Sequence, residues 1–393
     1  MAPEGGLGHL DRSVVARWAE VVVVGAGPAG AVAATLLARR GVRVALIHAE
    51  RGHGPIIGEV LPPAARPTFL ELGLGSALED RAHLRSPGNV SAWGSDVPQM
   101  TDFVFSPYGD GLHLDRACFD AHLRTVAAAS GARVLSGTWD VRRVSASGRD
   151  PGPIRVIVDC TGRSAAVARA AGASIDRLDR LVAVAGVLEP RSESADVDAR
   201  TFVASVSDGW WYSALLPDGR RVAAFHTDVD LLSRDARLDP RAWHGMLLRA
   251  PLVGSLVRSS GAHPPPTLRV LAADSRRLVR PRPTVEPPLP ARRGDPELVV
   301  AGDAAMAFDP LSSQGILSAI QSAEEAAAEV LASLGGDRDA VAGASAGRAD
   351  AAGDRWLRYV ERLVRAYGDE RRWPEAPFWA RRHAWFGAVG AMP

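Results

Sequence analysis

The sequence of 393 residues contains no lysine, so all 46 of its basic residues are arginine. GC-rich codon usage explains this bias, but the bias also excludes any mechanism that needs a lysine amine. Only two cysteines occur, Cys118 and Cys160, and they lie in unrelated segments without the spacing of a metal site. We therefore expect two buried thiols in a reducing cytoplasm, and no disulfide.

A strong charge of one sign and long apolar runs are also missing. The 46 basic residues are balanced by 45 acidic ones, and the net charge of +1 gives no indication of a nucleic-acid partner. No apolar stretch approaches the roughly 18 residues that a membrane-spanning helix needs, so we expect a cytoplasmic protein without a membrane partner. Residues 1–19 combine glycine, proline and charges, which indicates a flexible arm and not a signal peptide.

The first feature that is present is a β-α-β pattern near the N-terminus. Four valines at 21–24 predict a parallel strand buried on both faces, residues 31–40 predict a helix, and residues 42–48 predict a second strand. A glycine-rich pattern alone is equally typical of a simple turn, but this order of elements favours a dinucleotide-binding unit. The loop before the helix consists of Gly25, Ala26, Gly27, Pro28, Ala29 and Gly30.

Each glycine of this loop has a physical role in that interpretation. Gly25 permits the tight turn, Gly27 lets the backbone approach a pyrophosphate, and Gly30 lets the helix pack close to the strand. Pro28 suits the first helical turn, where its missing N–H costs nothing. The free N–H groups at the helix start would then face the phosphates.

An acidic residue about 20 positions beyond such a loop would bind the ribose of the dinucleotide. Glu50 lies at that distance from Gly30, and His48 would point to the same side of an extended segment. The alternative is that Glu50 is a solvated loop charge.

A second informative segment follows the strand predicted at 297–301. Gly302 and Asp303 come directly after the strand, and the Asp303 carboxylate can accept hydrogen bonds from sugar or ribityl hydroxyls. A loop containing Pro310 then leads into a long helix that begins near Ser313 and ends at Gly335. The start of this helix offers about half a positive charge to a ligand that becomes anionic, as a reduced isoalloxazine does.

The middle of the chain is rich in predicted strands, which form a second, antiparallel layer and a possible lid over a ligand. A turn at 217–220 joins two of them in a hairpin. Segment 281–296 is rich in proline, and we expect it to be poor in structure. The strands predicted for this layer are 181–188, 200–206, 210–216 and 220–227; strands are also predicted at 91–95 and 102–105, and 132–135 and 155–160 are predicted as further strands of the parallel sheet. The further predicted helices are 68–74, 113–130, 240–248 and the tail from about 348.

Three motifs in this order, at 25–30, 159–163 (Asp-Cys-Thr-Gly-Arg) and 302–305 (Gly-Asp-Ala-Ala), resemble the FAD-dependent aromatic hydroxylase superfamily with the p-hydroxybenzoate hydroxylase fold. The resemblance implies an α/β protein with FAD as its cofactor. Its doubly wound Rossmann-like FAD domain carries an inserted antiparallel β-sheet substrate domain and a C-terminal helical segment. The expected boundaries are 1–19 for the arm, 20–75, 110–180 and 297–336 for the FAD domain, 76–109 and 181–296 for the substrate domain, and 337–393 for the helical segment.

The same resemblance assigns further cofactor contacts. Arg116 would contact FAD near its pyrophosphate and ribose, and Pro310 would lie beside the flavin ring. Gly315 and Ile316 would offer backbone N–H groups to the flavin pyrimidine. This chain departs from the family pattern at His48, which occupies the position where the family usually has its ribose-binding acid. Glu50 is then the substitute for that acid.

A narrower resemblance, to the LodB/GoxB group, covers nearly the whole chain. Its motifs include Gly58-Glu-Val-Leu-Pro-Pro63, Gly209-Trp-Trp-Tyr-Ser213 and Asp309-Pro-Leu-Ser-Ser-Gln-Gly315. That group hydroxylates a peptide- or protein-bound tryptophan during the formation of a tryptophylquinone cofactor. The flavin-dependent tryptophan halogenases are similar too, but they require a lysine that this chain lacks, and residues 210–215 keep only the first tryptophan, Trp210, of their Trp-x-Trp-x-Ile-Pro motif.

Three residues are candidates for catalysis. Trp210 and Tyr212 lie on a predicted lid strand and could stack on an indole, although both could equally be ordinary aromatic residues of the core. Glu59 belongs to a loop that, by resemblance, approaches the flavin. It is either an acid or base beside the substrate or a structural carboxylate.

These features predict an FAD-dependent monooxygenase of an electron-rich aromatic ring, most favourably tryptophan in a peptide or protein, acting with O2 through a flavin C4a-hydroperoxide. The alternatives are the same chemistry on a free small aromatic, halogenation, and a non-catalytic FAD-binding scaffold. Only one dinucleotide motif is present, so either NAD(P)H binds transiently or a separate flavin reductase supplies the electrons.

Overall fold

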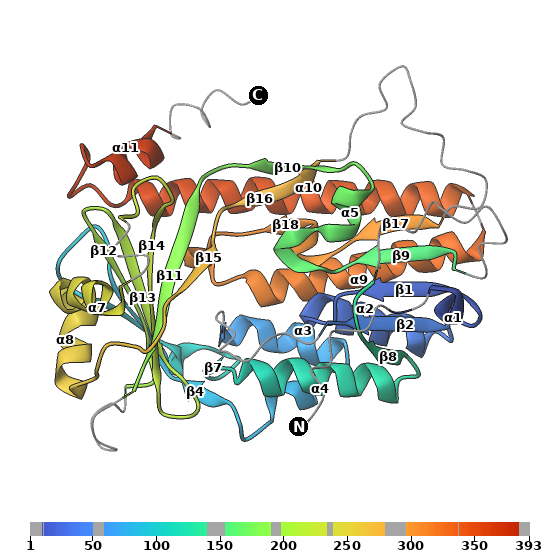
Figure 1. Cartoon of the computed structure of the whole chain (residues 1–393), viewed down its shortest axis with the longest axis horizontal. Coiled ribbons are helices and arrows are strands. Elements are labelled where there is room, and N and C mark those ends of the chain that lie inside the picture. The colour runs from blue at the N-terminus through green and yellow to red at the C-terminus, as the bar shows by residue number, and fades with distance from the viewer. Residues whose placement is uncertain are drawn as a thin grey trace, which may run out of the picture.

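A computed structural model describes residues 10, 12–49, 59–139, 154–189, 198–233, 239–279, 296–336 and 338–384. Figure 1 shows two sheet regions side by side, a parallel sheet with its helices and a larger sheet at the other end of the molecule. The long helix α10 (Arg338–Gly368) runs across both regions and joins them.

Among the described residues, the parallel sheet has five strands in the order β17-β9-β1-β2-β8, and all four neighbouring pairs are parallel. β1 lies at its centre, and its four valines are buried on both faces, as the run of valines predicts. The strands are β1 (Val21–Val24), β2 (Val44–His48), β8 (Arg133–Ser136), β9 (Val156–Asp159) and β17 (Glu297–Val300).

Helices cover one face of this sheet and build the largest apolar core. Alanine-rich faces of α2 and α9 pack together there with valines of β1, because small side chains allow two helices to approach closely. The opposite face packs against Val15 of α1 and against Trp139. The helices are α1 (Arg12–Ala16), α2 (Pro28–Arg39), α4 (Arg116–Ala129), α5 (Ala166–Ala170) and α9 (Gly315–Gly335).

The larger sheet, which we call the lid sheet, has seven strands in the part of the chain that the structure describes, in the order β15-β11-β14-β13-β12-β5-β6. The sequence predicted an antiparallel layer, but the sheet is mixed because β5 joins it from an earlier part of the chain and runs parallel to β12. The strands are β5 (Gly88–Ala92), β6 (Gln99–Asp102), β11 (Leu181–Leu188), β12 (Thr201–Val206), β13 (Gly209–Leu215), β14 (Arg221–Asp228) and β15 (Arg269–Ala272).

The prediction of a strand at 102–105 is wrong. β6 ends at Asp102, whose carboxylate accepts a hydrogen bond from the N–H of Val104 at 2.9 Å. This cap turns the chain into a short 3-10 helix at Phe103–Phe105. The hydrogen bond from the backbone to the Asp102 side chain therefore outweighs the β propensity of Phe103 and Phe105.

The lid sheet is covered on both faces. One face packs on α7 (Pro240–Arg249), which was predicted, and on α8 (Pro251–Ser260), which was not. The other face packs on α10 and α11 (Pro377–His383). Two small sheets and the helix α3 (Arg66–Glu71) are further elements of the described part of the chain. One small sheet consists of β3 (Val60–Leu61), β7 (Gly111–His113) and β4 (Leu84–Ser86), and the other of β10 (Ser174–Arg177), β16 (Arg276–Val279) and β18 (Met306–Ala307).

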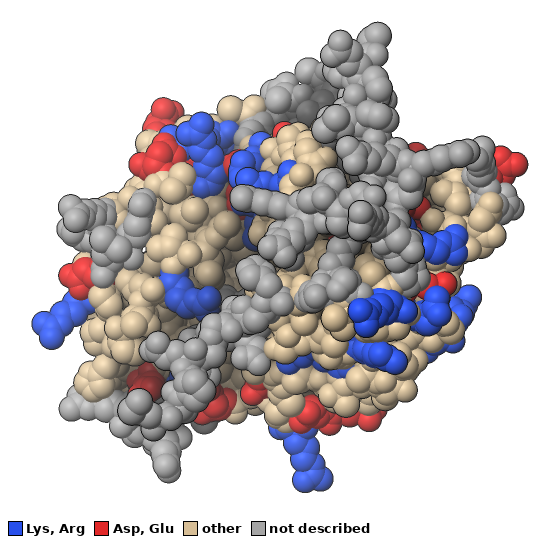
Figure 2. All heavy atoms as spheres, turned by 45° about the vertical axis from the view of Figure 1, so that its right-hand side comes forward, with Lys and Arg blue, Asp and Glu red and all other residues tan. Residues whose placement is uncertain are grey.

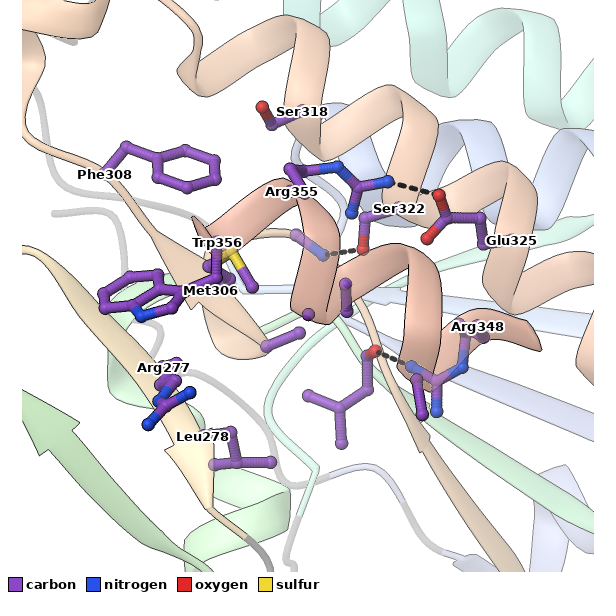
Figure 3. A pocket seen from close by; sticks show the side chains of 16 residues that line it. Arg277, Leu278, Met306, Phe308, Ser318, Ser322, Glu325, Arg348, Arg355 and Trp356 are labelled. Carbon is purple, nitrogen blue, oxygen red and sulfur yellow. Dashed lines mark hydrogen bonds and ion pairs between the residues drawn. The ribbon is translucent and has the colours of Figure 1, made fainter. Parts of the chain in front are cut away.

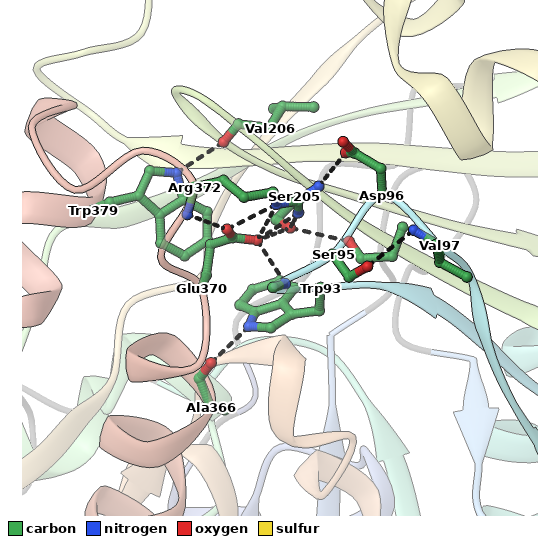
Figure 4. Close-up of polar contacts among 12 residues, drawn as sticks. Trp93, Ser95, Asp96, Val97, Ser205, Val206, Ala366, Glu370, Arg372 and Trp379 are labelled. Atoms are coloured by element: carbon green, nitrogen blue, oxygen red, sulfur yellow. Dashed lines mark hydrogen bonds and ion pairs between the residues drawn. The ribbon is translucent and has the colours of Figure 1, made fainter.

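Polar contacts fasten the C-terminal segment to the lid sheet (Figure 4). The fully buried Glu370 accepts hydrogen bonds from the N–H of Gly94 at 2.8 Å and from the Ser205 hydroxyl at 2.5 Å. Arg372 pairs with the same carboxylate, and these donors lower the pKa of Glu370 to about 2 although burial opposes them. The indole N–H of Trp379 adds a bond of 2.8 Å to the carbonyl of Val206.

Basic and acidic side chains lie scattered among uncharged ones on the face shown in Figure 2, without a continuous basic stripe. None of the described helices combines the length and the apolar character needed to cross a membrane. Within the described ranges, no cluster of three or more His, Cys, Asp or Glu side chains is arranged to hold a metal ion.

Candidate functional site

The glycine loop after β1 is shaped by close contacts on one side and is open on the other. A Cβ at Gly25, which has φ of +103°, would lie 2.2 Å from the carbonyl oxygen of Cys160. A Cβ at Gly30 would lie 1.8 Å from the Gly25 oxygen, so packing requires both glycines. A Cβ at Gly27 would meet nothing within 4 Å, and the open side of the loop is where a ligand's phosphates can approach the backbone.

Helix α2 begins directly at this open side. Its N-cap is Gly27, which has no side chain to accept from the N–H groups of the first turn, and Pro28 occupies the first helical position as predicted. The uncapped turn is a suitable partner for an anion such as a pyrophosphate.

The segment after β17 lies against the start of α2. A Cβ at Gly302 would approach the Cβ of Ala29 to 2.7 Å, and the φ of Gly302 is +63°, so both space and backbone conformation favour glycine there. The Gly302 N–H donates to the hydroxyl of Ser322 at 2.9 Å. Two predicted cofactor segments that lie more than 270 residues apart in sequence thus meet at one place.

Arginines gather around Asp303 in the same segment. The Nε of Arg163 lies 3.7 Å from an Asp303 carboxylate oxygen, and Arg163 also donates to the carbonyl of Phe308 at 2.8 Å. Burial raises the pKa of Asp303, while the positive charges of Arg163, Arg116 and Arg276 act to lower it. Arg116 is therefore close enough to act on Asp303, although its own ion pair, at 3.2 Å, is with Asp120.

The loop that precedes α9 ends in another uncapped helix start. Ser313 adopts the left-handed conformation with φ of +50°, which turns the chain into α9 at Gly315. No side chain caps the N–H groups of this first turn, and a Cβ at Gly315 would meet nothing within 4 Å. Gly315 and Ile316 thus present N–H groups of the kind that the flavin pyrimidine is expected to need, and Pro310 lies in the preceding 3-10 turn.

Asp309 anchors this loop to the C-terminal helix, a connection that the sequence analysis missed. The buried Asp309 carboxylate accepts from the Tyr367 hydroxyl at 2.7 Å and from the N–H of Leu311 at 2.9 Å, and the Asp309 N–H donates to Tyr359. Burial and the nearby Asp179 raise the pKa of Asp309 to about 7. The Asp-Pro pair signals a capped turn, but nothing local points to tyrosines about 50 residues away.

The adjacent tryptophans of β13, Trp210 and Trp211, point to opposite faces of the lid sheet. Trp210 is 1% exposed, stacks on His226 with ring centroids 3.6 Å apart, and donates its indole N–H to the Tyr367 hydroxyl. Trp211 packs against Trp243 beneath the helices of the other face. Trp210 is therefore enclosed in the core under α10, which favours a structural role over stacking on a substrate.

Tyr212 and Glu59 come together. The Tyr212 hydroxyl donates a short hydrogen bond to a carboxylate oxygen of Glu59, although the two residues are 153 positions apart. Glu59 is 1% exposed, and its carbonyl accepts from the N–H of Leu114 at 2.8 Å. Burial and the negative charge of Glu59 raise the pKa of Tyr212 well above its ordinary value, so the phenol stays protonated.

Two buried histidines near the lid sheet, His113 and His226, have structural surroundings. His113 lies 2.8 Å from the carbonyl of Leu215 and 3.0 Å from the hydroxyl of Thr201, and burial lowers its pKa to about 4. Burial likewise lowers the pKa of His226 to about 3. Both rings are neutral near pH 7.

The predicted ribose site is described only in part. His48 is the last residue of β2 and is half-buried, and its carbonyl accepts from the N–H of Gly137 at 2.9 Å. Glu50 lies outside the described residues, as do residues 51–58 before Glu59.

A family model described as an FAD binding domain matches residues 18–55, which span β1, α2 and β2. Over 380 residues the chain is 28% identical to the putative FAD-dependent oxidoreductase LodB of Marinomonas mediterranea, and the match covers 93% of this chain and 97% of LodB. The chain is an FAD-dependent oxidoreductase of the aromatic hydroxylase fold. Another relative of this flavoprotein is a tryptophan 2-halogenase of Chondromyces crocatus, 27% identical over 343 residues, with 81% of this chain and 62% of the halogenase covered.

Solved structures share the fold of this flavoprotein. The myxobacterial chondrochloren halogenase CndH matches with a TM-score of 0.76 at 22% identity, over 95% of this chain and 88% of that one. The peptidyl tryptophan dihydroxylase QhpG, essential for tryptophylquinone cofactor biogenesis, matches with a TM-score of 0.68 at 24% identity, over 93% of this chain and 78% of QhpG.

The site of this flavoprotein fits FAD in its shape and in its hydrogen-bonding groups. Gly27 and Gly315 leave open space beside two uncapped helix starts, and Asp303 lies in the segment that packs against the first of them. The helix start at Gly27 suits a pyrophosphate, and the helix start at Gly315 suits a flavin pyrimidine. The Asp303 carboxylate suits ribityl hydroxyls.

Proposed function

We propose that this flavoprotein is a monooxygenase that hydroxylates the indole of a tryptophan residue in a peptide or protein. The observation that carries the proposal is the buried Glu59–Tyr212 pair, which joins the lid sheet to the strand that follows Glu59. A likeness to LodB and to a peptidyl tryptophan dihydroxylase supports the choice of substrate.

FAD, when bound, would supply the activation of O2. The chain would hold it through the first turn of α2, through Asp303 and Arg116, and through the N–H groups of Gly315 and Ile316. His48, Glu50, Pro310 and Ser313 would complete these contacts. NAD(P)H or a separate flavin reductase would be the source of electrons.

Glu59 would act as the base in this reaction. When oxygen is added to an aromatic carbon, that carbon must lose its proton, and a carboxylate in a site closed to water is a suitable acceptor. The Tyr212 hydroxyl fixes the orientation of the Glu59 carboxylate, and the raised pKa of Tyr212 keeps its own proton in place. Trp210 would support this arrangement from the core and would not touch the substrate.

An exposed apolar segment favours a polypeptide substrate over a free aromatic. Contiguous exposed apolar side chains on a soluble protein are typical of surfaces that bind another chain. This segment leads directly into β7, which pairs with β3 immediately after Glu59. Its exposed side chains are Val97, Met100, Val104, Phe105 and Tyr108, and Phe105 is the most exposed of them at 87%.

Halogenation is the alternative that the relatives raise, because a tryptophan 2-halogenase and CndH are among them. The absence of any lysine counts against it, since the amine that the halogenases are expected to use has no equivalent here.

The test combines the purified protein, FAD, a reductant, O2 and a tryptophan-bearing peptide encoded beside its gene. We expect the peptide to gain the mass of one or more whole oxygen atoms. A product that forms only with bromide or chloride would establish halogenation instead. If neither any such peptide nor free tryptophan gains oxygen, the hydroxylase proposal is wrong.

A further inference from the structure

A cavity of about 310 Å³ lies between α9, α10, β16 and the segment from Gly302 to Phe308 (Figure 3). Ser318, Ser322 and Glu325 of α9 line it. The face of α9 that packs with α2 carries other residues, such as Ala319 and Ala323. The cavity is therefore on the side of α9 that faces away from the glycine loop, and it shares Gly302 with the FAD site described above.

Small residues of α10 leave this space open. Ala349, Ala352 and Gly353 line the cavity where the two long helices face each other, and larger residues there would fill it. A Cβ at Gly353 would meet nothing within 4 Å. The cavity volume is at the lower end of the range for small-molecule sites, so it suits a molecule with one or two rings.

Three arginines line the cavity, and one of them, Arg348, is paired with the buried Glu329. The other two give the cavity an anion-binding character. Arg355 donates from Nη2 to Glu325, and among the described residues its remaining donors have no partner. Arg277 pairs with Asp176 at 3.1 Å, but both side chains are about half exposed, so this pair is weak and the guanidinium can turn toward a ligand. A guanidinium is well suited to hold a carboxylate through two parallel hydrogen bonds.

Aromatic and apolar side chains also line the cavity. Trp356 is 8% exposed, and Leu278, Met306 and Phe308 lie around the same space in Figure 3. Ser318 also lines the cavity and adds a hydroxyl group to it.

We propose that this cavity is a second binding site, which takes a planar aromatic carboxylate. The ring would pack against Trp356 and Phe308, the carboxylate would bind Arg355 and Arg277, and Ser318 would hydrogen-bond to a polar atom of the ligand. Because the lining includes Gly302 and Phe308, the ligand would contact both ends of the segment that carries Asp303.

The test is isothermal titration calorimetry of the full chain with bound FAD, using indole-3-acetate and benzoate as probes and neutral indole as the comparison. We expect a carboxylate probe to bind with one site per chain and indole to bind at least about tenfold more weakly. No binding of either carboxylate, or equal binding of indole, would overturn the proposal. This measurement does not depend on oxygen transfer, so it can fail or succeed independently of the proposed function.

Substitutions in the cavity lining test whether the probe binds in this cavity. Gly353→Leu should fill the cavity and abolish binding, while Arg277→Met should weaken it about tenfold without unfolding the protein. Arg358→Met is the matched control, because Arg358 forms an exposed ion pair on α10 and does not line the cavity. If the Gly353→Leu variant does not fold, Ala352→Leu tests the same space. Binding that survives both leucine substitutions would show that the probe binds elsewhere.

Discussion

At the scale of single residues, the most unusual group is the carboxylate of Glu59. It is buried beside a phenol that stays protonated. A buried carboxylate is tolerated only when hydrogen-bond donors satisfy it, and Tyr212 is one such donor. Glu59 was predicted as a candidate base, but its partner on the lid sheet follows only from the fold.

Glu59→Gln should reduce product formation by about 100-fold or more, because an amide cannot take up the proton from the aromatic ring. The FAD content should not change, since Glu59 is outside the proposed cofactor contacts. The measurement is product yield per reduced flavin, with exposed Glu71→Gln as the matched control. Full yield in Glu59→Gln would exclude Glu59 as the base.

Tyr212→Phe should destabilise the protein by about 1–3 kcal/mol, because the buried Glu59 loses a donor. It should also slow hydroxylation less severely than Glu59→Gln, since the carboxylate remains but is no longer held in one orientation. Urea unfolding and single-turnover rates measure the two effects. Tyr108→Phe, at a half-exposed tyrosine, should change neither.

At the scale of elements, two turns that begin with Asp-Pro have the same local cap but differ in whether tertiary contacts bury the aspartate. Asp239 caps α7 from an exposed position, whereas Asp309 caps the turn before α9 from a buried one. An aspartate directly before a proline is enough to indicate a capped turn. The sequence does not indicate that Asp309 is buried under Tyr359 and Tyr367, because it does not show where α10 packs.

The pH dependence of stability should reflect this difference. The pKa of Asp309 is raised from 3.8 to about 7, so the folded state holds an extra proton between these values. The unfolding free energy should therefore fall as the pH rises from about 4 to about 7. Asp309→Asn should remove this contribution, whereas Asp239→Asn should leave it intact. Equal pH profiles for wild type and Asp309→Asn would contradict the shift.

The exposed segment between β5 and β7 is the element proposed to bind the substrate polypeptide. Phe105→Ser should raise the KM for the peptide about tenfold while kcat and the turnover of free tryptophan stay unchanged. Val14→Ser removes a similarly exposed apolar side chain on α1 and should have no effect. An unchanged peptide KM in Phe105→Ser would exclude this surface.

At the scale of the whole molecule, α10 and the chain that follows it hold the two sheet regions together. Tyr359 and Tyr367 contact the loop before α9, and Glu370 and Trp379 contact the lid sheet. These contacts tie the loop that leads into α9 to the lid sheet, which carries Tyr212.

Glu370→Gln should therefore lower the unfolding free energy by about 2–4 kcal/mol at neutral pH, because it removes a buried charge that Arg372 pairs with. The pKa of Glu370 is lowered from 4.5 to about 2, so its stabilisation is present above about pH 4.5 and is lost as the pH falls toward 2. Urea unfolding at several pH values tests this. Glu361→Gln, in an exposed ion pair on α10, should cost almost nothing.

The sequence by itself determined the β-α-β unit with its glycine loop and the Gly302–Ile316 segment. Both depend on residues close together in the chain, where glycine, proline and strand periodicity have direct conformational consequences. FAD as the cofactor followed from the resemblance of three motifs to a known family and not from local conformation. Only the tertiary structure decided that Trp210 is enclosed, that β5 makes the lid sheet mixed, and that Tyr212 reaches Glu59. These outcomes depend on which surfaces α10 and the lid sheet cover, and the packing of distant segments leaves no local pattern in the sequence.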